Sequence, residues 1–347
     1  MNTPQTLAFG TEAAHLPIKK MNIQRRALLP NDVSIEILYC GICHSDLHAA
    51  KNDWGGSTYP LVPGHEIVGK ITEIGSEVSK FKVGDLAAIG CIVDSCGTCS
   101  HCHEGEEQFC ESGWTVVFNS PDKISGGMTY GGFSEQIVAD ADYVLKMSDK
   151  VDLAASAPVL CAGITVYSPL KHWKVGPGKK VGIIGIGGLG HMAIKIAKAM
   201  GADVTVFTTS PSKMEDAKNL GADHAILSTD KSAMKDQRGF DMILDTVSAK
   251  HDVNVYLRAL KVDGSLVLVG LPNEPLEIGA FNVVNGRKSF SGSNIGGIAE
   301  TQEVIDFCAE HGITADIELI NPSEINEAFE RLEKGDVKYR FVIDLKK

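Results

Sequence analysis

The sequence has no excess of positive charge, no long apolar run, and no basic segment followed by an apolar one at its start. Its formal net charge of −11 argues against nucleic acid or an anionic membrane as a partner, because both would repel the chain. Residues 1–9 lack a signal-peptide pattern, and no stretch reaches the length of a transmembrane helix. Internal repeats and low-complexity tracts are absent too. We therefore expect a soluble, cytoplasmic protein, whose 347 residues suffice for two domains.

Cysteine, by contrast, is plentiful, with nine residues and no secretory signal. This favours a reducing compartment, where clustered thiols bind metal more often than they form disulfides. The strongest local pattern is Cys96-x-x-Cys99-x-x-Cys102, with Cys110 eight residues further on. Four thiolates at such spacing can surround one tetrahedral ion and leave no position open for a substrate. We predict a structural zinc lobe, while spacing alone also permits a redox thiol pair or an iron–sulfur cluster.

A second set of metal-binding residue types lies nearer the start of the chain. Cys43 and His65, together with the distant Cys161, would give zinc two sulfurs and one nitrogen. The fourth position would then stay open for water or substrate, as in catalytic zinc sites. Ser45 and His48 are placed to pass a proton between that position and solvent. Taken singly, the residues of this segment also have an ordinary interpretation as a buried cysteine, a hydrogen-bonded surface histidine and a capping aspartate.

The pattern of apolar and polar residues changes after Pro158. Before it, period-two alternation at 33–39 and 66–74, with turns between short runs, indicates strands and a partly closed barrel. After it, the apolar run 181–186 suits a strand buried on both faces of a parallel sheet. We expect further strands at 204–207, 225–227, 240–245, 265–270 and 337–344. Helices are expected at 189–200, 214–220, 300–311 and 323–334.

Gly185, Gly187 and Gly190 form a G-x-G-x-x-G pattern between an expected strand and an expected helix. In that position the pattern predicts a dinucleotide-binding turn, with its amides, including those of Gly188 and Leu189, facing a pyrophosphate. Gly187 would let the backbone approach the ligand.

The end of the second strand of this unit bears on the choice of cofactor. An acid that binds the ribose 2′-hydroxyl of NAD is expected there, but the segment reads Thr208-Thr209-Ser210-Pro-Ser-Lys213. Hydroxyls and an ammonium would bind the 2′-phosphate that a carboxylate would repel, so we predict NADP. A polar loop that tolerates either cofactor is the alternative. Asp203 lies at the opposite end of the strand.

The pattern Gly64-His65-Glu66-x-x-Gly69, with Cys43-His44-Ser45-Asp46, resembles the zinc-containing medium-chain alcohol dehydrogenases. Within them the chain is most similar to the cinnamyl alcohol dehydrogenase type of NADPH-dependent aldehyde reductase. The resemblance covers nearly the whole chain and implies an α/β fold. A GroES-like, partly closed β-barrel catalytic domain would comprise 1–155 and 298–347. A Rossmann domain with a doubly wound parallel sheet, which binds NADP, would comprise 156–297. Two zinc ions per chain and a homodimer or homotetramer are implied as well.

The same resemblance assigns roles around the catalytic zinc. Cys43, His65 and Cys161 would be its ligands, and Asp46 would hold His65 in the metal-binding tautomer. Glu66 would be a transient fourth ligand or a carboxylate behind the ligands, with a plain structural acid as the alternative.

Ser45 and His48 would form the proton relay, with a cofactor ribose hydroxyl between them, unless His48 is simply a surface residue. The pyrophosphate would face His44 and Arg340. The remaining contacts implied for the cofactor are Thr165, Val269, Ser293, Asn294 and Ile295.

The implied reaction is hydride transfer between NADP(H) and primary alcohols or aldehydes, with aromatic (cinnamyl, benzyl) or medium-chain aliphatic tails. Trp54, Cys91 and Trp114 are candidate pocket residues, although large aromatics are more often core. Cys91 matches no ligand position and, like Cys40 and Cys308, is also interpreted as a packed thiol.

Two other functions are weighed against this one. A polyol or amino-alcohol dehydrogenase fits less well, because such relatives commonly place a carboxylate where this chain has Cys161. A non-catalytic NADPH-binding regulatory protein would be expected to have lost zinc ligands or the open position, and the sequence keeps both.

Overall fold

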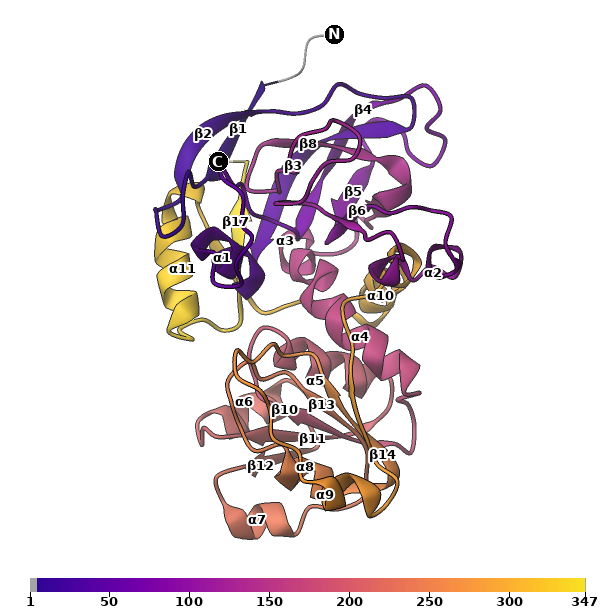
Figure 1. Ribbon diagram of the computed structural model, residues 1–347, viewed down its shortest axis with the longest axis vertical. Helices are drawn as coiled ribbons and strands as arrows, with labels where there is room; N and C mark the ends of the chain where they lie inside the picture. The colour runs from indigo at the N-terminus through magenta and orange to yellow at the C-terminus, as the bar shows by residue number, and fades with distance from the viewer. Residues whose placement is uncertain (1–4, 347) are drawn as a thin grey trace. The chain divides into compact units, whose positions relative to one another are not determined.

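The computed structural model describes residues 5–346 and divides them into two compact units (Figure 1). The first unit ends at Cys161 and resumes at Gly296, and the second is Ala162–Ile295. The expected boundary at 155 therefore falls earlier than the structural one. The reason is that helix α3 (Leu153–Ser156) and the 3-10 helix η3 (Ala157–Leu160) pack against strands of the first unit.

The first unit is built on a seven-stranded sheet. Its strand order is β16 (Ile317–Ile320), β17 (Arg340–Asp344), β3 (Asp32–Ile42), β4 (Ile67–Ile74), β5 (Leu86–Ile89) and β9 (Leu145–Lys146), with β8 (Gln136–Asp140) also paired to β3. Most neighbours are antiparallel, and β17 places Ile343 opposite Cys40 of β3. The C-terminal strand thus returns to the first unit, as the family resemblance implied.

Smaller elements complete this unit. They are the paired strands β1 (Gln5–Gly10) with β2 (Lys19–Gln24) and β6 (Ile92–Asp94) with β7 (Thr115–Val116), the helices α1 (His44–Lys51), α2 (Ser100–His103), α10 (Ile298–His311) and α11 (Ile325–Glu333), and the 3-10 helices η1 (Glu107–Phe109), η2 (Ala141–Tyr143) and η4 (Pro322–Glu324).

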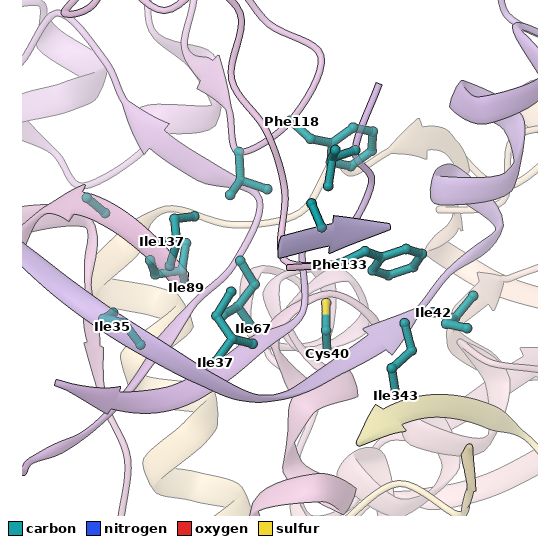
Figure 2. Close-up of a cluster of buried hydrophobic side chains, with 14 of the residues drawn as sticks. Ile35, Ile37, Cys40, Ile42, Ile67, Ile89, Phe118, Phe133, Ile137 and Ile343 are labelled. Atoms are coloured by element: carbon teal, nitrogen blue, oxygen red, sulfur yellow. The ribbon is translucent and has the colours of Figure 1, made fainter. Parts of the chain in front are cut away.

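Isoleucine is frequent in the core of the first unit. Many of these isoleucines lie on strands, where successive side chains point to opposite faces of the sheet and one face is buried. Figure 2 shows Ile35 and Ile37 of β3 with Ile67 of β4 and Phe133 in one cluster. Cys40 lies in the same cluster and is fully buried, which agrees with its interpretation as a packed thiol. Cys308, on α10, is also buried.

The second unit has a six-stranded parallel sheet. Its order is β12 (His224–Leu227), β11 (Asp203–Thr208), β10 (Lys180–Ile184), β13 (Phe240–Asp245), β14 (Leu260–Leu268) and β15 (Ser289–Gly292). Numbered along the chain this is 3-2-1-4-5-6, the Rossmann order, so the predicted doubly wound sheet is confirmed. The helices of this unit are α4 (Ala162–His172), α5 (Gly190–Ala199), α6 (Lys213–Asn219), α7 (Lys231–Lys235), α8 (Asn254–Ala259) and α9 (Ala280–Val284).

The structure departs from the predicted elements at a few places. Strand β14 begins at Leu260 rather than at the predicted 265. The prediction missed its first residues because Lys261, Asp263 and Gly264 interrupt the apolar pattern. Strand β17 begins at Arg340 rather than 337. Within residues 5–346 no single helix is long and apolar enough to cross a membrane; the bent pair Leu153–Leu160 and Ala162–His172 passes that test together, by length and composition only.

Candidate zinc and dinucleotide sites

Asp46 forms hydrogen bonds to both segments that carry the expected ligands of the catalytic zinc, Cys43 and His65. It is fully buried in the first turn of α1, where its Oδ2 accepts the backbone N–H of Cys43 at 2.9 Å. Its Oδ1 accepts the N–H of Gly64 at 2.8 Å and lies 3.0 Å from Nδ1 of His65. Because a carboxylate only accepts, Nδ1 carries the hydrogen and Nε2 of His65 is left for a metal.

The ligand atoms of Cys43, His65, Glu66 and Cys161 all lie within 4.8 Å of one another. The two sulfurs are 4.0 Å apart, and two thiolates bound to one tetrahedral zinc would be about 3.8 Å apart. A hydrogen bond from Cys161 lowers the pKa of Cys43 well below its usual range, and the same bond raises that of Cys161. Two sulfurs, an imidazole and a carboxylate are donors that suit zinc.

Glu66 supplies an independent observation that a cation fits here. Its carboxylate is fully buried, and Oε1 accepts from Nη2 of Arg340, while Oε2 has no hydrogen-bond partner. Gly41 is packed so closely on Oε2 that any side chain there would collide with it. Burial raises the pKa of Glu66 to about 7 despite the charge of Arg340. A buried carboxylate that lacks a partner at one oxygen, and that is grouped with three other ligand residues, is an acceptor for a metal ion.

Arg340, which the family resemblance places facing a pyrophosphate, is buried in the first unit. It is 4% exposed, and its guanidinium is engaged with Glu66 inside the first unit. His44 is exposed at the first position of α1, so its side chain is accessible.

The proposed relay residues lie on α1. The Ser45 hydroxyl is 3.8 Å from the Cys43 sulfur, and Nδ1 of His48 is 2.8 Å from a carboxylate oxygen of Asp53. The ring of Trp54, about half exposed, lies 4.9 Å from the ring of His48. Trp54 thus covers His48, and neither Asp53 nor this contact was predicted from the sequence. The only signal was an acid and an aromatic directly after the helix.

Cys91 lies beside the ligand set rather than in the apolar core. Hydrogen bonding with Cys161 lowers the pKa of Cys91, and the thiol is partly exposed. The neighbouring Gly90 packs on Leu160, which brings this segment to Cys161. Cys91 thus differs from Cys40 in its surroundings, since Cys40 lies among apolar side chains. Trp114 is partly exposed immediately before β7.

The four thiols of the Cys96–Cys110 segment converge within 4.8 Å of one another, with Cys99 and Cys102 sulfurs 3.5 Å apart. Backbone amides of Thr98 and Cys99 point at the Cys96 sulfur, and these bonds lower the pKa of Cys96 to about 5. A preformed thiolate among four sulfurs fits a closed zinc site with no position for substrate.

In the second unit the glycine-rich turn follows β10. Gly185 has φ +88, and a side chain on Gly190 would collide with the Gly185 carbonyl, so both positions require glycine. Gly187 is exposed with open space around its Cα, which leaves room for a ligand. Gly188 and Leu189 are half-buried and lead into α5.

The loop after β11 approaches this turn through Lys213, whose ammonium donates to the Ile186 carbonyl at 3.0 Å. Thr208 is buried and its hydroxyl accepts from the Ser210 N–H, while Thr209 is exposed. Asp203 lies at the other end of the strand and contacts His224 at 3.6 Å. The loop therefore presents a hydroxyl and an ammonium near the turn and no carboxylate.

Other predicted cofactor residues follow strands β14 and β15. The N–H of Val269 donates to Asp245, and that of Ser293 to Leu268. Because parallel strands end at one sheet edge, Val269 and the segment Ser293–Asn294–Ile295 share an edge with the glycine turn. Thr165 is buried on α4.

Comparison with known proteins agrees with this geometry. Residues 29–149 match the family described as alcohol dehydrogenase GroES-like domain, and residues 188–310 match zinc-binding dehydrogenase. The aldehyde reductase YahK of Escherichia coli is 54% identical over 97% of both chains. A probable mannitol dehydrogenase of Medicago sativa is also 54% identical, covering 97% of this chain and 95% of that one.

Among solved structures, CAD from Helicobacter pylori complexed with NADP(H) superposes with a TM-score of 0.94 at 41% identity, covering 100% of this chain and 99% of the other. Family matches in both units and high identity over nearly the full length lead to one conclusion. The chain belongs to the zinc-binding alcohol dehydrogenase family.

Proposed function

We propose that this protein transfers a hydride between NADP(H) and primary alcohols or aldehydes with aromatic or medium-chain aliphatic tails. The observation that carries the proposal is the open ligand set of Cys43, His65 and Cys161, grouped with the buried and incompletely paired carboxylate of Glu66. Zinc bound there polarises the substrate oxygen and lowers its proton affinity.

The residues around the ligand set can move the proton of the alcohol. The Ser45 hydroxyl lies 3.8 Å from the sulfur of Cys43, one of the proposed zinc ligands. The Asp53 carboxylate accepts from Nδ1 of His48, which leaves Nε2 with a lone pair to take a proton. His48 is partly exposed, so it can release that proton to solvent.

NADP(H) is the proposed cofactor because of the loop from Thr208 to Lys213. Its exposed Thr209 hydroxyl and the Lys213 ammonium suit a 2′-phosphate, and the bond from Lys213 to Ile186 keeps that charge at the glycine turn. A charge-assisted hydrogen bond contributes about 1.5–3 kcal/mol, and about 1.4 kcal/mol is a factor of ten in affinity. A single such bond thus supports at least about tenfold preference for NADPH.

The test is kcat/KM for NADPH and NADH with one good aldehyde such as benzaldehyde. Thr209→Asp should weaken NADPH by about tenfold or more and narrow or invert the preference, because the new carboxylate repels the phosphate. Lys213→Ala should weaken NADPH alone, and high salt should reduce the difference. Lys218→Ala, on the same helix, is the matched control and should change neither value. Equal use of NADH and NADPH by the wild-type protein would refute the cofactor assignment.

A polyol substrate is the second candidate, because a probable mannitol dehydrogenase is as similar to this chain as the aldehyde reductase is. The terminal hydroxyl of a polyol is itself a primary alcohol, so the same ligand set could bind it. Overall identity therefore does not separate the two classes. Turnover of mannitol, benzyl alcohol and cinnamyl alcohol at equal concentration with NADP decides between them.

We also propose two zinc ions per chain, a cytoplasmic location and assembly as a homodimer or homotetramer. The location rests on nine cysteines that are all free thiols. The assembly rests on the second unit, where β15 ends the sheet among the described residues. Close to it in sequence, Phe281 is 79% exposed and Val284 71% exposed, an apolar surface that a second copy could cover.

A further inference from the structure

We infer that His251 is a positioning residue for the cofactor: its imidazolium, bound to the buried carboxylate of Asp245, holds the loop that supports the dinucleotide turn. The inference rests on the proposed use of that turn by a dinucleotide. All the groups involved belong to the second unit, whereas the metal ligands belong to the first.

The contacts of His251 specify its protonation state. Asp245 is the last residue of β13 and is fully buried, with Oδ2 at 2.9 Å from Nε2 of His251. Nδ1 lies 2.9 Å from the Ala249 carbonyl. A carbonyl and a carboxylate both only accept, so each ring nitrogen needs a hydrogen to bond its partner. Only the imidazolium satisfies both contacts, and it also neutralises a carboxylate that burial would otherwise leave unpaired.

The surrounding charges favour the imidazolium. The bond from Asp245 raises the pKa of His251, with smaller contributions in the same direction from the Ala249 carbonyl and the charge of Asp252, while burial opposes them. On the α8 side the ring meets Tyr256 edge-on at 6.2 Å, and burial raises the pKa of that phenol, so it stays neutral. The neighbouring Lys250 is paired with Glu274. The charges of Asp245 and Asp252 act in the same direction as the two acceptor contacts, which the imidazolium alone satisfies.

The loop held by this pair, residues 246–250, supports the glycine turn directly. The N–H and the hydroxyl of Thr246 both donate to the Ile184 carbonyl, at 3.2 and 2.7 Å. A methyl group on Gly185 would lie 3.0 Å from Val247, and one on Gly190 would lie 3.3 Å from the Thr246 hydroxyl. The loop therefore forms a wall against the first and third glycines of the turn.

The Asp245–His251 pair fixes this wall at both ends. Oδ1 of Asp245 accepts the Val247 N–H at 3.1 Å, while His251 pulls in the Ala249 carbonyl. The Asp245 carbonyl accepts from Val269 and Gly270, so the same residue also holds the end of β14. When the imidazolium loses its proton, one of its two contacts breaks. The loop is then held less firmly, and the turn loses part of the support that keeps its amides aimed at a pyrophosphate.

The linkage has a definite sign. Because folding raises the pKa of His251 above its ordinary value of about 6.5, the imidazolium contact is complete below that value and is lost as pH rises through the folded pKa. Cofactor affinity should therefore fall on the alkaline side. Turnover at saturating cofactor should change little, because the proposed chemistry uses residues of the first unit.

The experiment uses zinc-loaded wild-type protein, His251→Gln and His251→Lys, with His224→Gln as a matched control for an exposed histidine of the same unit. NADPH binding is measured by fluorescence titration from pH 6 to 9, and kcat and KM for NADPH are measured in parallel. Glutamine keeps one donor but no charge, so His251→Gln should raise Kd and KM for NADPH about tenfold at pH 7, with kcat within about twofold. Its Kd should not vary with pH in the range where wild-type Kd rises.

His251→Lys carries a charge that persists to higher pH, and it should restore part of the affinity and move the alkaline rise upward. The inference is overturned if His251→Gln keeps wild-type Kd and pH dependence, or if it loses kcat in proportion to KM. It is also overturned if the loss of affinity merely follows a lower melting temperature measured without cofactor. Wild-type protein that binds no NADPH at all would instead overturn the proposed function.

Discussion

Replacement of Asp46 by asparagine tests how the first unit prepares its metal site. The carboxylate accepts from the Cys43 N–H with one oxygen, and from the Gly64 N–H and the His65 ring with the other. Asparagine has nearly the same shape, but its amide nitrogen cannot accept. If its oxygen faces His65, two N–H groups oppose each other at Cys43; the reverse orientation leaves His65 without its acceptor.

The magnitude follows from the bond that is lost. A hydrogen bond to a charged group contributes about 1.5–3 kcal/mol, and removal of a partner that orients a metal-binding histidine typically costs 10–100-fold in metal affinity. At about 1.4 kcal/mol per factor of ten, both figures describe the same loss. Asp46→Asn should therefore weaken one zinc by about 10–100-fold. The four-thiol site contains no residue that Asp46 contacts, so the second zinc should be unaffected.

The assay is competition for zinc with a chromophoric chelator, resolved into two ions per chain. Asp53→Asn is the matched control, because Asp53 follows the same helix and its carboxylate binds His48 rather than a metal ligand. Its zinc curve should coincide with that of the wild type. The reasoning fails if Asp46→Asn releases zinc like the wild type, or if both zinc ions are weakened together.

Two further predictions concern catalysis and assembly. His48→Gln should lower kcat mainly at and below neutral pH, with partial recovery in concentrated imidazole buffer, because it removes the proton acceptor; an unchanged pH–rate profile would make His48 a bystander. Phe281→Asp should reduce the assembly size seen by analytical ultracentrifugation without lowering the melting temperature of the protomer, because the ring is 79% exposed. Val83→Asp, at a 59% exposed position of the first unit, is its control, and an unchanged mass for Phe281→Asp would exclude this surface from the interface.

Sequence reasoning worked best where the structure is decided locally. Strand β13 occupies Phe240–Asp245, the predicted range, because an apolar run with no alternation has few alternatives to a buried parallel strand. The glycine turn and the four-thiol segment could be predicted for the same reason, since each is formed by residues that are close together in the sequence. The family, the fold and the zinc and nicotinamide chemistry followed from these motifs.

Contacts between distant segments could not be predicted in this way. Arg340 reaches Glu66 across 274 residues, and it does so only because β17 pairs beside β3. Nothing near Arg340 in the sequence indicates a buried ion pair, and its expected place facing the pyrophosphate came from the family resemblance alone. Asp245 and His251 are close in sequence, but their pairing depends on the loop conformation that buries the carboxylate.

Burial of the Glu66 carboxylate beside the other metal ligands has a cost in free energy. Removing a carboxylate from water without complete pairing is costly, and here one of its oxygens is bound by Arg340 while the other has no partner. A sheet that buries this half-satisfied carboxylate next to two thiols and an imidazole concentrates negative charge and unmet acceptors at one point. A divalent cation relieves both at once, so binding of the metal and stability of this part of the first unit must be linked. Burial of Arg340 has an electrostatic reason, because its guanidinium stabilises the buried Glu66 carboxylate whether or not that carboxylate contacts the metal.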